Sequence, residues 1–267
     1  MTQQATTRWK VMKWNGADCT EQEDDIVTEY PLTIRLDGEE FATMVCTPTD
    51  LEELVIGFLA SEGIIRVIED IASISIDTDR GFANVELRIK QSLQKDFYSK
   101  RFIGSCCGKG RQFYFQNDVK TAKTVMSRDK VTVEQCLSLM EQLHSQSPDF
   151  LKTGGVHNAA LCIPDEMIVS RTDIGRHNAL DKLYGFCILH RIPVRGKLIA
   201  FSGRISSEVL LKTAKIGIGV LLSKSAPTDL ALNLAEELGI TAVGFIRGER
   251  MNVYTHPERI YRMPGNL

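Results

Sequence analysis

Apolar and polar residues alternate along the first third of the chain, and the period changes once from that of a strand to that of a helix. Short alternating runs bounded by turn residues predict strands, and the pair Asp37-Gly38 predicts a tight turn between the first two. Apolar residues at helical spacing from Leu51 to Leu59 predict a helix that ends near Gly63. The predicted strands are Pro31 to Leu36, Phe41 to Cys46, Ile71 to Asp77 and Ala83 to Ile89.

The middle of the chain begins with residues 91–127, which show no clear period, and then returns to regular patterns. The run from Thr132 to Gln135 forms a capping box, which predicts a helix that begins there and ends at Pro148. The predicted elements that follow are strands over Ala159 to Ile163 and Met167 to Ser170 and a helix from about His177 to His190.

The last third alternates short buried strands with helices. The predicted strands are Leu198 to Phe201, Val220 to Leu222 and Thr241 to Ile246, and the predicted helices are Ser206 to Lys215 and Thr228 to Leu238. Short connections between them predict parallel strands covered by helices, and ligands of such sheets bind beyond the carboxyl ends of the strands. The residues at those ends form either a site for a phosphate-bearing ligand or ordinary turns. They are Ser202-Gly203-Arg204, Ser223-Lys224-Ser225 and Arg247-Gly248-Glu249-Arg250.

The composition is that of an ordinary globular protein. Its 267 residues exceed one average domain, so two unequal domains or one large one are expected. With 32 lysines and arginines against 34 acids, the formal net charge of −2 predicts no general attraction to nucleic acid or to an anionic membrane. The polar N-terminus is unlike a secretory signal, and no apolar stretch approaches the ~20 residues of a membrane helix. We therefore expect a cytoplasmic protein.

Two of the seven cysteines are adjacent, Cys106 and Cys107. The nearby Arg101, Lys109 and Arg111 favour a thiolate and so lower a thiol pKa. A disulfide within the pair is unfavourable because neighbouring Cα atoms lie ~3.8 Å apart, below the usual range of about 4.4–6.8 Å. No further Cys or His lies at the spacing of zinc ligands. The pair is either a reactive thiol site or two inert thiols in a loop, and the other five cysteines are expected to be single buried or incidental thiols.

Two histidine-containing segments lie where loops are expected to converge. Backbone amides before His157 can bind an anion, although a hydrogen-bonded core histidine is the commoner outcome. Asp173 either contributes to a site or caps the following helix, with Arg176 and His177 solvated on its first turn. The chain has no GxxxxGK[ST] loop, no GxGxxG motif and no Pro-Cys-x-x-Cys, so a P-loop enzyme, a Rossmann dehydrogenase and a zinc deaminase are not supported.

Several longer motifs occur in order from about residue 29 to the C-terminus. They are Glu29-Tyr30-Pro31-Leu32-Thr33-Ile34, Ser105-Cys106-Cys107-Gly108-Lys109, Thr153-Gly154-Gly155-Val156-His157-Asn158-Ala159-Ala160-Leu161, Asp173-Ile174-Gly175-Arg176-His177-Asn178-Ala179-Leu180-Asp181-Lys182, Ser202-Gly203-Arg204-Ile205-Ser206, Ser225-Ala226-Pro227-Thr228 and Gly244-Phe245-Ile246-Arg247. In these motifs and their order the chain resembles the FdhD family of formate dehydrogenase accessory sulfur carriers. Together these motifs are far more specific than any one of them.

The resemblance implies an α/β fold, with a C-terminal cytidine-deaminase-like three-layer α/β/α domain that binds cofactor (residues 128–267). The remaining residues, 1–127, are expected to form a smaller α+β domain that ends in a mobile cysteine loop. The resemblance also implies that a cysteine desulfurase loads sulfur onto the carrier as a cysteine persulfide. A sulfurtransferase-type transfer then delivers it to the bis(molybdopterin guanine dinucleotide) molybdenum cofactor of formate dehydrogenase. A homodimer is implied, with no tightly bound metal of the protein's own. The alternative is a scaffold or chaperone that binds the cofactor without moving sulfur.

The resemblance further implies which residues act. Many members have Cys-x-x-Cys before a glycine, and anchoring on Gly108 places the second cysteine at Cys107 and the first at Gly104. Cys107 is therefore expected to carry the persulfide, and Cys106 to be an assisting or alternative acceptor. The residues expected to bind the guanine-dinucleotide cofactor are Phe245, Ile246, Arg247, Gly248, Glu249, Arg250, Ser202, Gly203, Arg204 and His177.

Overall fold

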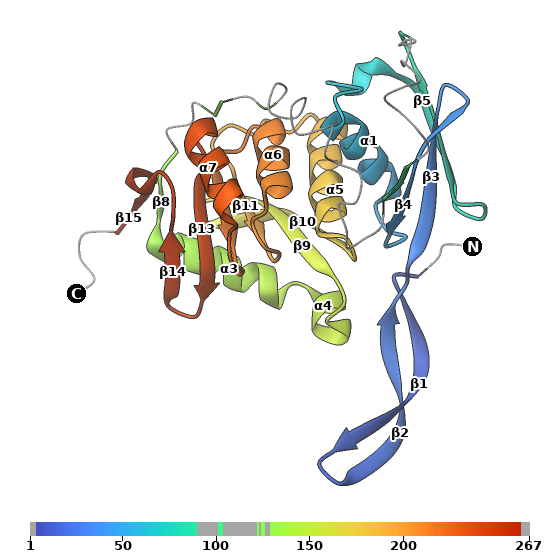
Figure 1. The fold of residues 1–267 in the computed structure, drawn as a ribbon, viewed down its shortest axis with the longest axis horizontal. Coiled ribbons are helices and arrows are strands. Elements are labelled where there is room, and N and C mark those ends of the chain that lie inside the picture. Colours follow the sequence, from blue (N-terminus) through green and yellow to red (C-terminus); the bar gives the residue numbers. More distant parts are fainter. Residues whose placement is uncertain (1–3, 90–100, 104–121, 123, 126–128, 263–267) are drawn as a thin grey trace.

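The computed structural model describes residues 4–89, 101–103, 122, 124–125 and 129–262 (Figure 1). Within the described residues, its first part contains a separate hairpin, a five-stranded sheet of order β5-β6-β3-β4-β7, the helix α1 and a short 3-10 helix over Ile68–Asp70. The elements of this part are β1 (Thr6–Asn15), β2 (Asp18–Val27), β3 (Tyr30–Leu36), β4 (Glu39–Cys46), α1 (Leu51–Ser61), β5 (Ile71–Asp77), β6 (Phe82–Leu87) and β7 (Arg101–Ile103).

The second part is built on a six-stranded sheet of order β10-β9-β11-β12-β13-β14, beside a small pair, β8 and β15. Its elements are β8 (Val131–Thr132), α3 (Val133–Ser145), α4 (Pro148–Thr153), β9 (His157–Ile163), β10 (Glu166–Asp173), α5 (Arg176–Leu189), β11 (Leu198–Phe201), α6 (Ser207–Ile216), β12 (Val220–Ser223), α7 (Asp229–Leu238), β13 (Thr241–Arg247), β14 (Arg250–Val253) and β15 (Ile260–Tyr261).

The larger sheet is the middle layer of three, with α5, α6 and α7 on one face and α3 on the other (Figure 1). One apolar core lies between the sheet and the three helices, and another lies between the sheet and α3. Strands β11, β12 and β13 pair in parallel, as the alternation of strands and helices predicts. The mixed α/β class is therefore confirmed, while the division into domains at residue 127 stays a prediction.

Local chemistry explains why these elements begin and end where they do. The Asp37-Gly38 turn has positive φ at both residues, 51° and 88°, as expected of a tight hairpin turn. Thr132 caps α3 and forms the predicted capping box with Gln135. The hairpin β1–β2 and the strand β14 were not predicted. Residues 6–27 are rich in charge, so their strand period carries little hydrophobic signal.

Helices α1 and α5 cross where each contributes a glycine, and this contact joins the two parts of the chain. A Cβ atom on Gly57 would lie 1.8 Å from the carbonyl oxygen of Asp181. One on Gly185 would lie 1.8 Å from the carbonyl oxygen of Glu53. Only glycine permits the two backbones to approach this closely. The N-terminal core, which includes much of α1, packs against Tyr184 and other residues of α5.

Among the described residues, no helix is both long enough and apolar enough to cross a membrane.

Candidate functional site

The carboxyl ends of β11, β12 and β13 meet at one edge of the larger sheet and are joined by hydrogen bonds. The Ser223 hydroxyl donates to the carbonyl oxygen of Gly203 at 2.7 Å, and the Ser225 hydroxyl donates to that of Ser202 at 3.1 Å. The backbone amide of Ser225 donates to the Ser223 hydroxyl at 3.0 Å. The predicted strand-end residues of β11 and β12 are therefore brought together by their own short polar side chains.

Strand β13 reaches the same edge through an irregularity that turns an aromatic side chain outward. Its pairing with β14 shifts register between Gly244 and Arg247. Within this bulge Phe245 has a φ of 53°, its amide donates to the Ser225 carbonyl oxygen at 3.2 Å, and its side chain is 41% exposed. Bulges of this kind re-aim side chains beside functional sites. Ile246 points the other way, into the core beneath the sheet, so only its backbone is available to a ligand.

Two arginines face each other at the end of the β13–β14 hairpin. Arg247 and Arg250 are directly paired in the register, and Gly248 and Glu249 form the turn between them. The Arg247 guanidinium donates to the carbonyl oxygen of Lys224 at 3.3 Å, which holds it next to β12. Like charges opposite one another destabilise a strand pair, and a bound anion would remove this repulsion. Both arginines are exposed.

The start of β9 and the end of β10 reach the same edge, because β9 runs antiparallel to both of its neighbours. The backbone amide of Asn158 donates to the hydroxyl of Ser202, which directly follows β11, at 2.9 Å, and the Ser202 amide donates to the Asn158 carbonyl oxygen at 3.0 Å. His157 is paired with Asp173, the last residue of β10. The two histidine-containing segments are thus neighbours in space.

Helix α5 begins at this edge with Arg176 and His177. The Nε2 atom of His177 lies 2.9 Å from the Glu208 carboxylate, which is its partner. The buried Nε atom of Arg176 has no hydrogen-bond partner among the described residues. A Cβ atom on Gly203 would lie 2.9 Å from the ring of Phe201, so glycine at this position leaves room for that ring. Buried polar atoms without partners require an explanation, and a ligand that accepts hydrogen bonds is one.

The electrostatics of this end of the edge favour an anion. Burial, followed by the neighbouring charges of Arg176 and His177, lowers the pKa of His157. Burial also lowers the pKa of His177, and the Glu208 carboxylate offsets this only in part. Both histidines are therefore neutral and hydrogen-bonding at neutral pH, beside the permanent charge of Arg176. The exposed Arg204 lies at the end of β11 on the same edge.

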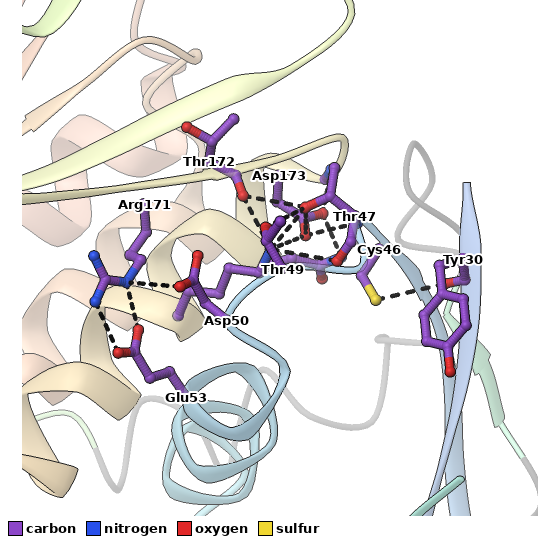
Figure 2. A network of polar contacts seen from close by, with 12 residues as sticks. Tyr30, Cys46, Thr47, Thr49, Asp50, Glu53, Arg171, Thr172 and Asp173 are labelled. Atoms are coloured by element: carbon purple, nitrogen blue, oxygen red, sulfur yellow. Dashed lines mark hydrogen bonds and ion pairs between the residues drawn. The ribbon is translucent and has the colours of Figure 1, made fainter. Parts of the chain in front are cut away.

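Asp173 does not cap α5, because that position belongs to Gly175. Instead, Asp173 is fully buried and forms an ion pair with the buried Lys182 at 2.8 Å. Its carboxylate also accepts hydrogen bonds from the amide of Gly175 at 2.8 Å and from the amide and hydroxyl of Thr47, both at 3.0 Å. Figure 2 shows Thr47 and Asp173 facing each other across the junction between the two parts of the chain. Asp173 therefore fixes the start of α5 against the N-terminal sheet.

Further side chains of the same motif strengthen this junction. The Asn178 amide donates to the Val45 carbonyl oxygen and to Asp173, both at 2.9 Å. Lys182 donates to the Thr47 hydroxyl at 2.7 Å and to the Thr172 carbonyl oxygen at 2.9 Å. Arg171 makes a bidentate pair with Glu53 of α1, also visible in Figure 2. The motif from 173 to 182 thus supports the edge and also places the half-buried Arg176 and His177 on it.

The predicted sulfur carriers, Cys106 and Cys107, lie outside the described residues. Of the other five cysteines, Cys19 is partly exposed and the remaining four are buried, as the sequence predicts. Burial is the largest effect on all four thiols: it raises the pKa of Cys46, Cys136 and Cys162 to about 12, and that of Cys187 to about 11. These four thiols are unsuited to nucleophilic chemistry.

Sequence reasoning expected both histidine segments where loops converge, but it did not pair the residues of one with those of the other. Arg176 and His157 were considered individually and were not assigned to the cofactor site. The signal was present in the hairpin that turns at Pro164-Asp165, because counting back from that turn pairs the start of β9 with the end of β10. Among the described residues, no cluster of three or more metal-binding side chains occurs.

The fold and this edge define a mixed α/β protein in which several arginines, one of them with an unpartnered buried nitrogen, gather near the carboxyl ends of parallel strands. The chain belongs to the FdhD/NarQ family, which matches residues 27–261. It is similar to proteins named sulfur carrier protein FdhD. The relative from Geobacillus kaustophilus is 62% identical over 96% of this chain and 97% of its own, and that from Bacillus subtilis is 57% identical over 97% and 99%.

A solved structure resembles this one over almost its whole length. It is the crystal structure of a protein described as a formate dehydrogenase accessory protein from Desulfotalea psychrophila. The TM-score is 0.78 and the sequence identity 27%, covering 96% of this chain and 100% of that one.

Proposed function

We propose that this chain is a sulfur carrier for formate dehydrogenase, which accepts sulfur from a cysteine desulfurase as a persulfide on Cys107. The observation that supports it most strongly is the 62% identity, over almost the full length, to a protein named as a sulfur carrier. The crystal structure of a protein described as a formate dehydrogenase accessory protein supports the choice of recipient.

The loading step is an exchange at sulfur. The Cys107 thiolate attacks the terminal sulfur of the desulfurase persulfide, the sulfur–sulfur bond within the desulfurase breaks, and its cysteine leaves as a thiolate. The exchange moves one sulfur atom and needs no external oxidant or reductant. Lys109 and Arg111, close in sequence, favour the attacking anion. Cys107 then presents its terminal sulfur to the molybdenum of the substrate cofactor.

The substrate in this proposal is the bis(molybdopterin guanine dinucleotide) cofactor, and the sheet edge fits its phosphates. Arginine fork geometry suits phosphate oxygens, and Arg204, Arg247 and Arg250 are exposed at this edge. The Nε atom of Arg176, which has no partner in the chain, supplies a further donor. Phe245, turned outward by the bulge, offers a planar face to a guanine base.

The decisive experiment is mass spectrometry of the full chain after incubation with a cysteine desulfurase and cysteine. We expect the peptide that contains residues 106 and 107 to gain one sulfur atom, which a reductant removes. The gain should disappear in Cys107→Ser and persist in the matched control Cys106→Ser. Peptides with Cys46, Cys136 and Cys162 should stay unmodified in the folded protein because burial raises each pKa to about 12.

Two other outcomes of this experiment would each lead to a different conclusion. Sulfur that persists in Cys107→Ser but is lost in Cys106→Ser would show that the assignment within the pair is wrong. No sulfur on either residue, with a desulfurase shown to be active, would favour a scaffold that binds the cofactor without moving sulfur.

A further inference from the structure

Helix α6 lies next to α5 (Figure 1) and places a carboxylate, that of Glu208, beside the sheet edge. The helix follows the end of β11, and Glu208 lies in its first turn after the cap Ser206. The Glu208 carboxylate lies 2.9 Å from the Nε2 atom of His177, and the two side chains are 24% and 23% exposed. An acid close to an anion site weakens anion binding, because the two charges repel each other. The position of Glu208 therefore requires an explanation.

A purely local explanation accounts for only part of this arrangement. A carboxylate in the first turn of a helix interacts favourably with the helix dipole, and Glu208 has this benefit. The dipole does not require that the carboxylate face a histidine of another helix. The contact between Glu208 and His177 is the feature that a role in helix stability leaves unexplained.

The charges around His177 come from two helices and one strand. On α6, Lys212 lies one turn beyond Glu208 and is itself paired with an aspartate of α5. On α5, Arg176 directly precedes His177, and His157 at the start of β9 is a further neighbour. Burial lowers the pKa of His177 most, Glu208 raises it, and Lys212 and Arg176 lower it slightly further. Within the described ranges, Glu208 is the one neighbour that favours the protonated ring.

The two other elements that pack against α5 direct their charges elsewhere. On β10, the carboxylate of Asp173 is paired with Lys182. The Arg171 guanidinium of the same strand is paired with Glu53 of α1. Neither pair is among the groups that shift the pKa of His177 in the described part of the chain. The protonation of His177 is thus controlled by its burial, by Glu208 and by the two cations.

The contact with Glu208 also decides which nitrogen of the ring carries a proton. An ionised carboxylate only accepts hydrogen bonds, so the Nε2 atom of neutral His177 carries the proton and Nδ1 has a lone pair. The oxygens of an ionised phosphate diester also only accept. The Nδ1 atom can therefore donate to a phosphate only after it has taken up a second proton. The protonated ring would then lie between two anions, and each of them favours its positive charge.

We propose that Glu208 is a positioning residue of this edge: it holds His177 through Nε2, so that the ring takes up a proton at Nδ1 when a phosphate diester of the cofactor binds. The inference rests on the proposed function, because the cofactor supplies the phosphate. The proton comes from solvent, and only the N–H bond at Nδ1 forms. Binding of the phosphate and of the proton are linked, so each raises the affinity for the other by the same factor.

The first test concerns the chain without a ligand. NMR of the full chain follows the protonation and the tautomer of each of the five histidines, and His177→Gln identifies the signal of His177. In Glu208→Gln the pKa of His177 should be lower than in the wild type, because the carboxylate that favours its charge is gone. An unchanged pKa of His177 in this variant, or a proton on Nδ1 instead of Nε2 in the neutral wild-type ring, would overturn the proposal.

The matched control removes a carboxylate from another histidine. Glu236 lies 3.6 Å from the Nε2 atom of His256, whose carbonyl oxygen accepts a hydrogen bond from Thr241 at the amino end of β13. This pair is at the opposite end of the sheet, so Glu236→Gln should leave the titration of His177 as it is in the wild type. Equal effects of the two glutamate variants would contradict a specific role for Glu208.

The second test measures binding of diguanosine pyrophosphate by calorimetric titration at a series of pH values. This probe is a diester and lacks the terminal phosphate group, which titrates with a pKa near 6 and would obscure the effect. In the wild type the affinity should rise as the pH falls, by up to about tenfold per pH unit, which is the limit for uptake of one proton. In Glu208→Gln the rise should move to lower pH, and in His177→Gln it should be lost. His157→Gln is the control and should retain it.

The outcomes separate this inference from the proposed function on which it rests. A probe that binds the wild type with an affinity independent of pH would overturn the inference and leave the cofactor site intact. A probe that binds at no pH would overturn both. A pH dependence that is lost in His157→Gln and kept in His177→Gln would assign the proton to the wrong histidine and overturn the inference. Urea denaturation checks that each variant is folded; if Glu208→Gln is not, Glu208→Asp withdraws the carboxylate by one methylene and should lower the pKa of His177 less.

Discussion

At the scale of single residues, the histidines of the sheet edge differ from ordinary histidines because burial and neighbouring cations lower their pKa values. Burial is the largest effect on both, and the neighbouring charges of Arg176 and His177 lower the pKa of His157 further. The neutral form is therefore the one that the folded chain favours. An arginine surrounded by neutral donors is a suitable receptor for phosphate, because the ligand supplies the missing negative charge.

This shift predicts how stability depends on pH. An unfolded histidine has a pKa near 6.5, above the folded values of His157 and His177, so the unfolded chain takes up protons first as the pH falls. The stabilising effect is complete above about pH 6.5 and is lost as the pH falls toward the folded pKa values. We expect urea denaturation to show a steep loss of stability below that pH. In a variant with both His157→Gln and His177→Gln the loss should be shallower.

Comparing the double histidine variant with the wild type requires a reference pH at which both histidines are neutral in the folded and in the unfolded chain. At about pH 8 the difference between variant and wild type reflects packing alone, and subtracting it isolates the effect of protonation. The interpretation is wrong if the two proteins lose stability in parallel as the medium becomes acidic.

At the scale of elements, the sequence predicts helix ends well because capping is local. Thr228 and Ser206 accept hydrogen bonds from the third amide of their helices, and Gly239 ends α7 in the left-handed conformation. How helices pack is not local. Nothing near Gly57 or Gly185 in the sequence indicates that these two residues meet, since the contact joins α1 to α5 across more than a hundred residues.

Gly185→Ala should therefore destabilise the protein although alanine favours helices. The intrinsic preference would stabilise by roughly 1 kcal/mol, but the added Cβ would lie 1.8 Å from the Glu53 carbonyl oxygen, and overpacking of this kind costs about 1–3 kcal/mol or more. Urea denaturation followed by circular dichroism measures the net loss. Asn233→Ala, at an exposed position of α7, is the control and should be neutral or slightly stabilising. Unchanged stability of the glycine variant would mean that the helices do not cross here.

At the scale of the whole molecule, a buried ion pair joins the N-terminal sheet to the start of α5. Asp173 and Lys182 are both fully buried, and Thr47 contacts each of them. Such pairs give little net stability, but removing one partner leaves an uncompensated charge. The network in Figure 2 therefore sets the position of the sheet edge relative to the N-terminal part more than it strengthens the core.

Lys182→Met should lower the free energy of unfolding by about 3 kcal/mol, because the Asp173 carboxylate keeps its hydrogen bonds but loses its counter-charge. Adding Asp173→Asn should recover part of the loss, as both charges are then removed. Thermal and urea denaturation measure both effects. Arg80→Ala breaks the exposed pair with Asp77 and should change little. Similar small losses in the lysine and arginine variants would contradict a coupling role for the buried pair.

The sequence alone determined the order and type of most elements, because periodicity, caps and turns are local signals. It also determined the parallel character of β11, β12 and β13 and the strand ends as a candidate site. The motif resemblance led to the family, which the match over residues 27–261 confirmed.

Only the tertiary structure decided what the motif residues do. It placed Asp173 and Lys182 in the interior, Ile246 in a core and Phe245 outward, and it brought His157 next to Arg176. The hairpin β1–β2 also appeared only in the structure. In each case the deciding interaction joins residues distant in sequence or depends on a strand register, and neither the hydrophobic period nor a local motif contains that information.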